Sequence, residues 1–197
     1  MKKEKLKTKD LIYAGAFAAI YIIAMFIIVM GLGIIPVLYL LAPLFVGIIC
    51  ATIYMMYVSK VKKFGAILIL AILFGAIMSS SGHGMTVIMA IPIGLLAEFI
   101  AKIKGYKSKK MLVLSYAVFN LTMIAPFQLL YTASDQFVGQ CRDYYGDVYA
   151  DTIDGFITTY GGKLLASQIV VGVVGALIGG WLATVLFKKH FEKSGLV

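Results

Sequence analysis

Charged residues are scarce in this chain. Asp, Glu, Lys and Arg make up 14% of its 197 residues, whereas hydrophobic residues make up 61%. Soluble domains usually contain about 25% charged and about 45–50% apolar residues, because their surfaces face water. The composition therefore excludes an ordinary water-soluble fold and predicts an integral membrane protein.

The residue types that build most catalytic and metal centres are also few. The chain has two histidines, His83 and His190, and two cysteines, Cys50 and Cys141. Neither type occurs in the spacing of a metal site, and the sequence contains no H-E-x-x-H, Walker or G-x-S-x-G motif. Cys50 falls in an apolar run and Cys141 in a polar loop, so we expect no disulfide between them. We expect no enzyme, no resident metal and no cofactor of its own.

Long apolar runs are what the sequence does contain. A helix needs roughly 20 apolar residues to cross about 30 Å of hydrocarbon, and the runs are continuous rather than alternating. They leave no length for a nucleotide-binding domain, so any use of ATP requires another chain. We predict an all-α bundle of six transmembrane helices in one membrane domain, residues 1–197, at about 11–31, 36–59, 64–80, 85–103, 110–133 and 164–187.

Basic residues are distributed asymmetrically around these segments. All of the 18 except Arg142 and Lys163 fall on one side of the predicted bundle. Cytoplasmic loops are enriched in Lys and Arg, so both termini are predicted to be cytoplasmic in a multi-pass protein of the cell membrane. This placement explains the net charge of +9 by membrane topology, and we expect no nucleic-acid partner. The basic residues on that side are Lys2, Lys3, Lys5, Lys7, Lys9, Lys60, Lys62, Lys63, Lys102, Lys104, Lys107, Lys109, Lys110, Lys188, Lys189 and Lys193.

Ionisable side chains are nearly absent between the membrane boundaries. Glu98 is the one acid in a predicted span, and its spacing from Lys102 predicts an i,i+4 ion pair near the cytoplasmic end. Proton-coupled carriers ordinarily need relays of ionisable groups near the midplane. Proton coupling is therefore disfavoured, while Na⁺ binding by backbone carbonyls stays open.

The connection at 134–162 is too long for a simple turn. It contains five Asp residues beside several tyrosines. Connections longer than about 12–15 residues are usually functional or disordered, and aromatic residues argue against disorder. We predict an ordered outer lid with a short helix over 147–160.

Uncharged polar side chains near the outer face are the candidates for ligand binding. The turn 79–84, with sequence SSSGHG, either caps two helices or contacts a ligand from outside. Asn120 lies deeper, and for it we favour hydrogen bonds between helices. The candidate substrate-binding residues are Ser80, Ser81, His83, Met85, Gln128, Tyr131, Asp135, Arg142 and Tyr160.

Small residues on the first predicted helix suggest a family. Ala14 and Ala18 repeat at i,i+4, as do Gly15 and Ala19, and they follow the Lys-rich segment KLKTKDLIYAG. With six helices and a cytoplasmic N-terminus, this pattern resembles the substrate-binding S components of energy-coupling-factor (ECF) transporters, and most closely the MptD, or Trep_Strep, family. The resemblance implies that these four residues dock onto a transmembrane coupling protein, and that two ATPase subunits drive import while the chain topples in the bilayer.

The substrate stays open between two classes. Tyrosines in the lid favour a planar ring system, and the acidic lid favours a cationic or neutral ligand. Arg142 and Lys163 could instead meet carboxylates, and His83 with Met85 could reach the iron of haem. We therefore expect a micronutrient, either a vitamin-like cofactor or haem or another tetrapyrrole. The alternative function is a stand-alone six-helix secondary transporter or facilitator.

Overall fold

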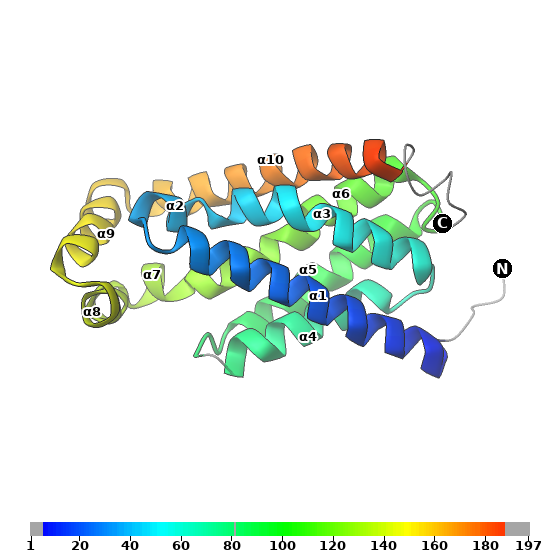
Figure 1. The fold of residues 1–197 in the computed structure, drawn as a ribbon, viewed down its shortest axis with the longest axis horizontal. Coiled ribbons are helices and arrows are strands. Elements are labelled where there is room, and N and C mark those ends of the chain that lie inside the picture. Colours follow the sequence, from blue (N-terminus) through cyan, green and yellow to red (C-terminus); the bar gives the residue numbers. More distant parts are fainter. Residues whose placement is uncertain (1–5, 81, 188–197) are drawn as a thin grey trace.

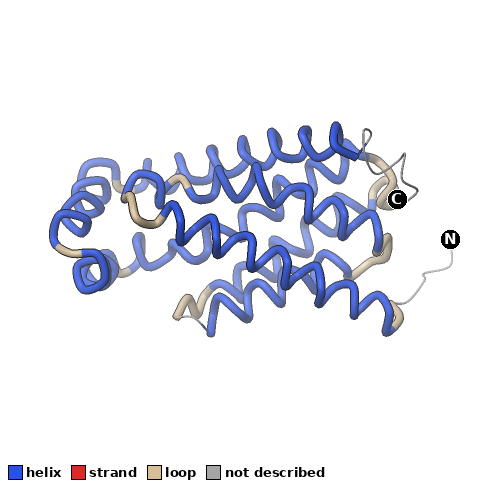
Figure 2. The backbone as a smooth tube through the Cα atoms, in the orientation of Figure 1, coloured by secondary structure: helices blue, strands red, loops and turns tan. Residues whose placement is uncertain are grey.

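The computed structural model describes residues 6–80 and 82–187, and these residues form helices joined by short turns, with no strand among them (Figures 1 and 2). The predicted all-α fold is confirmed. In chain order the elements are α1 (Thr8–Leu32), α2 (Pro36–Leu40), α3 (Ala42–Lys60), α4 (Ala66–Ser80), α5 (Thr86–Lys102), α6 (Lys109–Phe119), the 3₁₀ helix η1 (Asn120–Phe127), α7 (Gln128–Thr132), α8 (Ser134–Tyr145), α9 (Asp147–Tyr160) and α10 (Gly162–Leu186).

Four stretches of helix are long and apolar enough to cross a membrane: α1, α3, the run from α6 through α7, and α10. Two further helices, α4 and α5, run beside them but have 15 and 17 residues (Figure 1). At 1.5 Å per residue these two reach about 22 and 26 Å, somewhat less than the roughly 30 Å of a bilayer core. Among the described residues, four stretches are therefore candidate spans by length and composition, and the count of six remains a prediction.

Two of the predicted segments are interrupted helices. The segment expected at 36–59 divides at Leu41 into α2 and α3, and a proline stands in the first turn of each helix. Proline fits the first turn because no intrahelical partner awaits its missing N–H. The segment expected at 110–133 changes to 3₁₀ geometry in η1, which contains Pro126. Both interruptions lie near the lid end of the bundle (Figure 1).

The closest helix contact joins α3 to α10. A Cβ added to Gly47 would lie 2.7 Å from the Ala176 nitrogen, and one added to Gly179 would lie 2.5 Å from the Ile48 carbonyl oxygen. Such approach is available only to glycine, and it lets backbones pack by van der Waals contact where lipid removes the hydrophobic driving force. The small residues Gly175, Ala176 and Gly179 of α10 therefore serve packing inside the chain.

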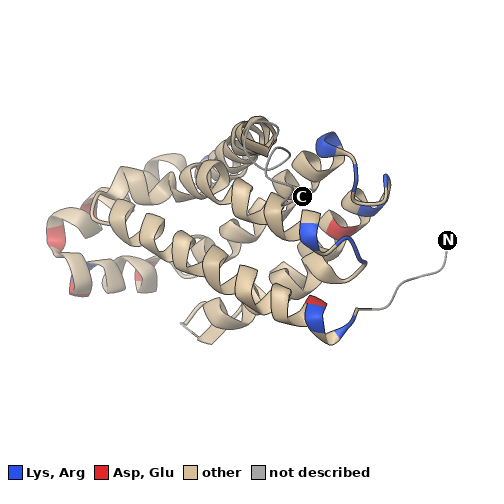
Figure 3. Cartoon of the chain, turned by 45° about the vertical axis from the view of Figure 1, so that its right-hand side comes forward, with Lys and Arg blue, Asp and Glu red and all other residues tan. Residues whose placement is uncertain are grey.

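Charge separates along the long axis of the molecule. Lysines gather at the end where α1 begins and α10 ends, and aspartates gather on α8 and α9 at the opposite end (Figure 3). Asp10 and Lys63 join α1 to the connection between α3 and α4 by an ion pair of 2.8 Å. The asymmetry is that expected of a positive-inside protein, while the orientation itself remains a prediction.

Glu98 does not pair with Lys102 as the spacing predicted. Its carboxylate accepts hydrogen bonds from the backbone N–H groups of Ile67 (2.8 Å) and Leu68 (3.2 Å), and from the Tyr106 hydroxyl (2.6 Å). The Lys102 ammonium lies instead 4.7 Å from the ring centroid of Phe64. The first N–H groups of a helix have no intrahelical acceptor, and a carboxylate there also meets the positive end of the helix dipole. Glu98 is therefore the N-terminal cap of α4, and the predicted ion pair is wrong.

Candidate functional site

The lid consists of two helices, α8 and α9, that turn at Gly146. Gly146 has φ +86°, a left-handed conformation that favours glycine, and Gly161 at the return to the bundle has φ +47°. The lid helices cover an apolar cluster separate from the main core. Its buried members are Leu40, Leu130, Phe137, Cys141, Tyr149, Ala150, Ile153 and Leu164.

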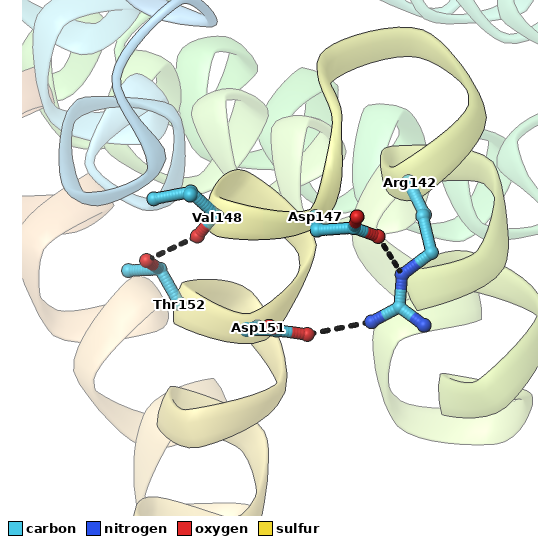
Figure 4. A network of polar contacts seen from close by, with 5 residues as sticks. All are labelled: Arg142, Asp147, Val148, Asp151 and Thr152. Atoms are coloured by element: carbon cyan, nitrogen blue, oxygen red, sulfur yellow. Dashed lines mark hydrogen bonds and ion pairs between the residues drawn. The ribbon is translucent and has the colours of Figure 1, made fainter.

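Arg142 holds the two lid helices together (Figure 4). Its Nε lies 3.0 Å from Asp147 Oδ1, and its Nη2 lies 2.6 Å from Asp151 Oδ1. All three side chains are largely exposed, so each contact contributes only about 0.2–1 kcal/mol. Arg142 was predicted as a substrate-binding residue that could meet a ligand carboxylate, and its guanidinium here is bound by the lid's own acids. Within the same turn of α9, the Thr152 hydroxyl donates to the Val148 carbonyl (2.7 Å).

A half-open apolar pocket of about 130 Å³ lies between α2, α9 and α10, and we call it the lid cavity. Its volume is close to the about 150 Å³ of an engineered cavity that accepts benzene. Ligand sites are commonly apolar concavities with a few polar groups that fix orientation. The lining residues are Val37, Leu40, Leu41, Phe156, Leu164, Ser167, Gln168 and Val171.

Gln168 is the buried polar residue of the lid cavity, with 1% of its surface exposed. Its Nε2 donates to the Leu40 carbonyl (3.1 Å), and its Oε1 accepts a hydrogen bond from the Tyr131 hydroxyl. Leu40 ends α2, where carbonyl groups have no intrahelical donor, so the interruption of the second segment supplies this acceptor. Tyr131 was predicted as a site residue and Gln168 was missed, although Gln168 is the one carboxamide in the last apolar segment.

Three other predicted site residues lie near the lid but do not line its cavity. Gln128 begins α7 and is half-buried, while Asp135 is exposed in the first turn of α8. Tyr160 ends α9 with half of its surface exposed, and its ring stacks on Phe156 at a centroid distance of 6.0 Å. Tyr160 therefore supports a cavity wall from outside.

The turn between α4 and α5 is held by its own hydrogen bonds. The Ser79 hydroxyl accepts from the Val87 N–H (3.2 Å) and donates to the Gly84 carbonyl (3.2 Å), and the Ser80 hydroxyl donates to the Ile77 carbonyl (2.7 Å). These contacts fit the helix-capping interpretation of this segment. His83 and Met85 lie in the same turn, which is separate from α8 and α9 in the fold (Figure 1). Ser81 lies outside the described residues.

Asn120 bridges helices, as the favoured interpretation predicted. Its side-chain amide donates to the carbonyls of Pro43 (3.0 Å) and Gly172 (2.9 Å), on α3 and α10. Gly172 lies one helical turn beyond Gln168 on α10. The side-chain amides of Asn120 and Gln168 therefore connect the part of α10 near the lid to α2 and α3.

The small residues of α1 form two faces. Ala14 and Ala18 are 1% and 2% exposed and belong to the main core, which includes residues of α3 and α4. Gly15 and Ala19 are exposed on α1. Ala14 and Ala18 are therefore covered by other parts of this chain, and their docking role stays a prediction; the exposed small residues among the four are Gly15 and Ala19.

Helical bundle, apolar surface and charge separation together define an α-helical integral membrane protein with several spans. The sequence profile of a family described as a hypothetical bacterial integral membrane protein (Trep_Strep) matches residues 8–193. The chain therefore belongs to the Trep_Strep family. Neither the curated proteins nor the solved structures contain a match to it.

Proposed function

We propose that the protein is the S component of an ECF-type importer, a membrane subunit that captures a micronutrient outside the cell. The observation that carries this proposal is the lid cavity, a half-open apolar space beside the buried Gln168 and against Phe156 of the lid helix α9. A concave apolar site with few convergent polar groups is the usual form of a small-molecule site. Its position at the acidic end of the bundle fits capture from the outer face.

The energy for import would come from partner subunits. Glu98, the acid within a predicted span, caps α4 near the basic end and accepts three hydrogen bonds, so it is poorly suited to carry protons across the bundle. We propose that a transmembrane coupling protein and two ATPase subunits supply the driving force. The chain itself would have no enzymatic activity and would hold no cofactor, and ATP would be hydrolysed by the partners.

The coupling protein would meet the exposed side of α1. Small side chains at Gly15 and Ala19 allow a partner helix to approach closely within the bilayer. A Cβ added to Gly15 would have no neighbour within 4 Å inside this chain, so this side is not used for internal packing. This arrangement keeps the docking surface separate from the lid cavity.

The geometry favours a vitamin-like cofactor over haem as substrate. The lid cavity of about 130 Å³ is close to the size of one aromatic ring, whereas drug-sized ligands occupy about 300–1,000 Å³. His83, the histidine that could reach haem iron, lies in the α4–α5 turn and does not line the cavity. A tetrapyrrole would require a different site or a wide opening of the lid.

Native mass spectrometry of the protein purified together with coexpressed coupling protein and ATPases tests the proposal. We expect one small molecule per chain and its release when the module hydrolyses ATP. The alternative, a stand-alone secondary transporter or facilitator, predicts that no module copurifies. A protein that never carries a small molecule after growth in rich medium would contradict the proposal.

A further inference from the structure

We propose that the lid cavity binds the uncharged carboxamide or lactam edge of a planar ring, and that Gln168 is the residue that recognises it. The inference rests on the proposed function in one respect: it takes the lid cavity to be the substrate site. It goes further by naming the chemical class of the part of the substrate that is buried.

The Gln168 side chain has hydrogen-bonding capacity that the chain itself does not use. A glutamine side chain has two N–H donors and an oxygen with two lone pairs. One donor is used on the Leu40 carbonyl and one lone pair on the Tyr131 hydroxyl. Within residues 6–80 and 82–187 the Gln168 side chain has no further partner. One donor and one acceptor therefore remain on Gln168, and a carboxamide or a lactam is a neutral ligand group that offers both an acceptor and a donor.

The remaining lining of the lid cavity selects against charge. Apart from Gln168 it consists of apolar side chains and Ser167, whose hydroxyl donates to the Leu164 carbonyl in its own helix (2.7 Å). A buried charge without a partner is far more costly than a buried neutral polar group with its hydrogen bonds. A carboxylate would also present two acceptors to Gln168 and no donor for its Oε1.

The lid outside the cavity disfavours anions as well. Its aspartates outnumber its basic residues, and Arg142, the lid's arginine, is already bound by Asp147 and Asp151. An acidic rim lowers the local concentration of an anionic ligand and raises that of a cation. A substrate with an uncharged buried ring and any positive charge directed outward fits both regions.

Tyr131 acts as a positioning residue. Its hydroxyl can donate only to the oxygen of Gln168, while the Leu40 carbonyl can accept only from the nitrogen, so the two contacts fix which end of the amide is which. Without the Tyr131 hydroxyl the Leu40 carbonyl still holds the amide nitrogen, but Oε1 loses its hydrogen-bond donor and the amide is held at one point only. Tyr131→Phe should therefore weaken the discrimination between neutral and charged ligands more than it weakens binding of the ring itself.

Three one-ring probes that differ only in their polar group test the inference: benzamide is neutral, benzoate is an anion and benzamidine is a cation. Affinities would be measured by ligand-detected NMR with the full chain in nanodiscs. We expect benzamide to bind at least about tenfold more tightly than benzoate, because benzoate leaves buried polar groups unpaired. Gln168→Leu should lose about tenfold or more for benzamide, and Ser167→Ala, the matched control on the same wall, should lose none.

A reversal of ligand preference distinguishes direct recognition of the ligand by Gln168 from a purely structural role of this residue. Gln168→Glu places a carboxylate in the cavity, which pairs with an amidinium through two hydrogen bonds, so this variant should prefer benzamidine over benzamide. Each variant is first shown to unfold at the temperature of the wild type. If a Gln168 variant does not fold, the inference is tested by the order of the three probe affinities in the wild type and in Tyr131→Phe.

The outcomes distinguish this inference from the proposed function. Equal binding of benzoate and benzamide, binding of none of the probes, or an unchanged ranking in folded Gln168→Glu overturns the inference. If in that case a small molecule still copurifies and is imported with the coupling module, the proposed function stands and only the ligand class is wrong. If no ligand copurifies either, both fail.

Discussion

Gly179→Ala should separate α3 from α10 and lower the stability of the bundle. The new Cβ would lie 2.5 Å from the Ile48 carbonyl oxygen and 2.7 Å from the Ile48 Cα. Both neighbours are backbone atoms, which cannot rotate away as a side chain can, so the helices must move. Forcing extra volume into a packed core costs about 1–3 kcal/mol, and the higher helix propensity of alanine returns up to about 1 kcal/mol. We expect a net loss of about 1–2 kcal/mol.

The matched control for this change is Gly15→Ala. A Cβ at Gly15 would have no neighbour within 4 Å, so the same substitution should leave stability unchanged or raise it by up to about 1 kcal/mol. Reversible unfolding by SDS in mixed micelles, followed by the fluorescence of Trp181, the single tryptophan, measures both variants. If Gly179→Ala is as stable as the wild type, or Gly15→Ala is equally destabilised, the close α3–α10 contact is not as described.

Three further predictions follow from burial. Ala18→Leu should destabilise the fold because this position is 2% exposed. Ala19→Leu should leave folding and ligand binding intact but reduce copurification of the coupling protein. The opposite result would assign docking to the face of Ala14 and Ala18. Burial raises the pKa of the Cys141 thiol, so its alkylation in lipid should be slow near pH 7 and accelerate with rising pH. Alkylation should be faster in Arg142→Met, because this variant loses the ion pair with Asp151 that joins the two lid helices. Glu98→Leu should cost about 2–3 kcal/mol in SDS unfolding, since it leaves the start of α4 uncapped, and a neutral effect would argue against the cap.

The helices were predictable because their signal is local. Apolar runs of span length mark where the bundle crosses the membrane, and the described helices begin and end within a few residues of the expected segments. The interruptions were less accessible. Pro43 stands in the first turn of α3, so it marks a helix start rather than a kink inside a helix, and hydropathy does not separate these two cases. The α8 helix of the lid lacks a long apolar run and was not expected.

The residue roles that spacing alone does not decide share one physical cause. Helix α1 is apolar on all sides, so the spacing of Ala14 and Ala18 identifies a face but not whether it points inward. Glu98 and Lys102 have ion-pair spacing, yet the start of α4, 31 residues away, offers the carboxylate better partners. The role of Gln168 is recognisable only in the fold, where Leu40 and Tyr131 lie beside it and form hydrogen bonds with its side chain. Contacts between distant segments decide these roles, and a single sequence does not contain them.

Transport by purified protein in liposomes distinguishes an ATP-driven import subunit from a carrier that works alone. The chain would be reconstituted alone and together with the coupling protein and ATPases, and accumulation of the copurifying small molecule would be followed by mass spectrometry under proton, Na⁺ and ATP conditions. We predict binding but no accumulation by the chain alone, and ATP-dependent accumulation with the partners. Accumulation by the chain alone, driven by an ion gradient, would contradict the account.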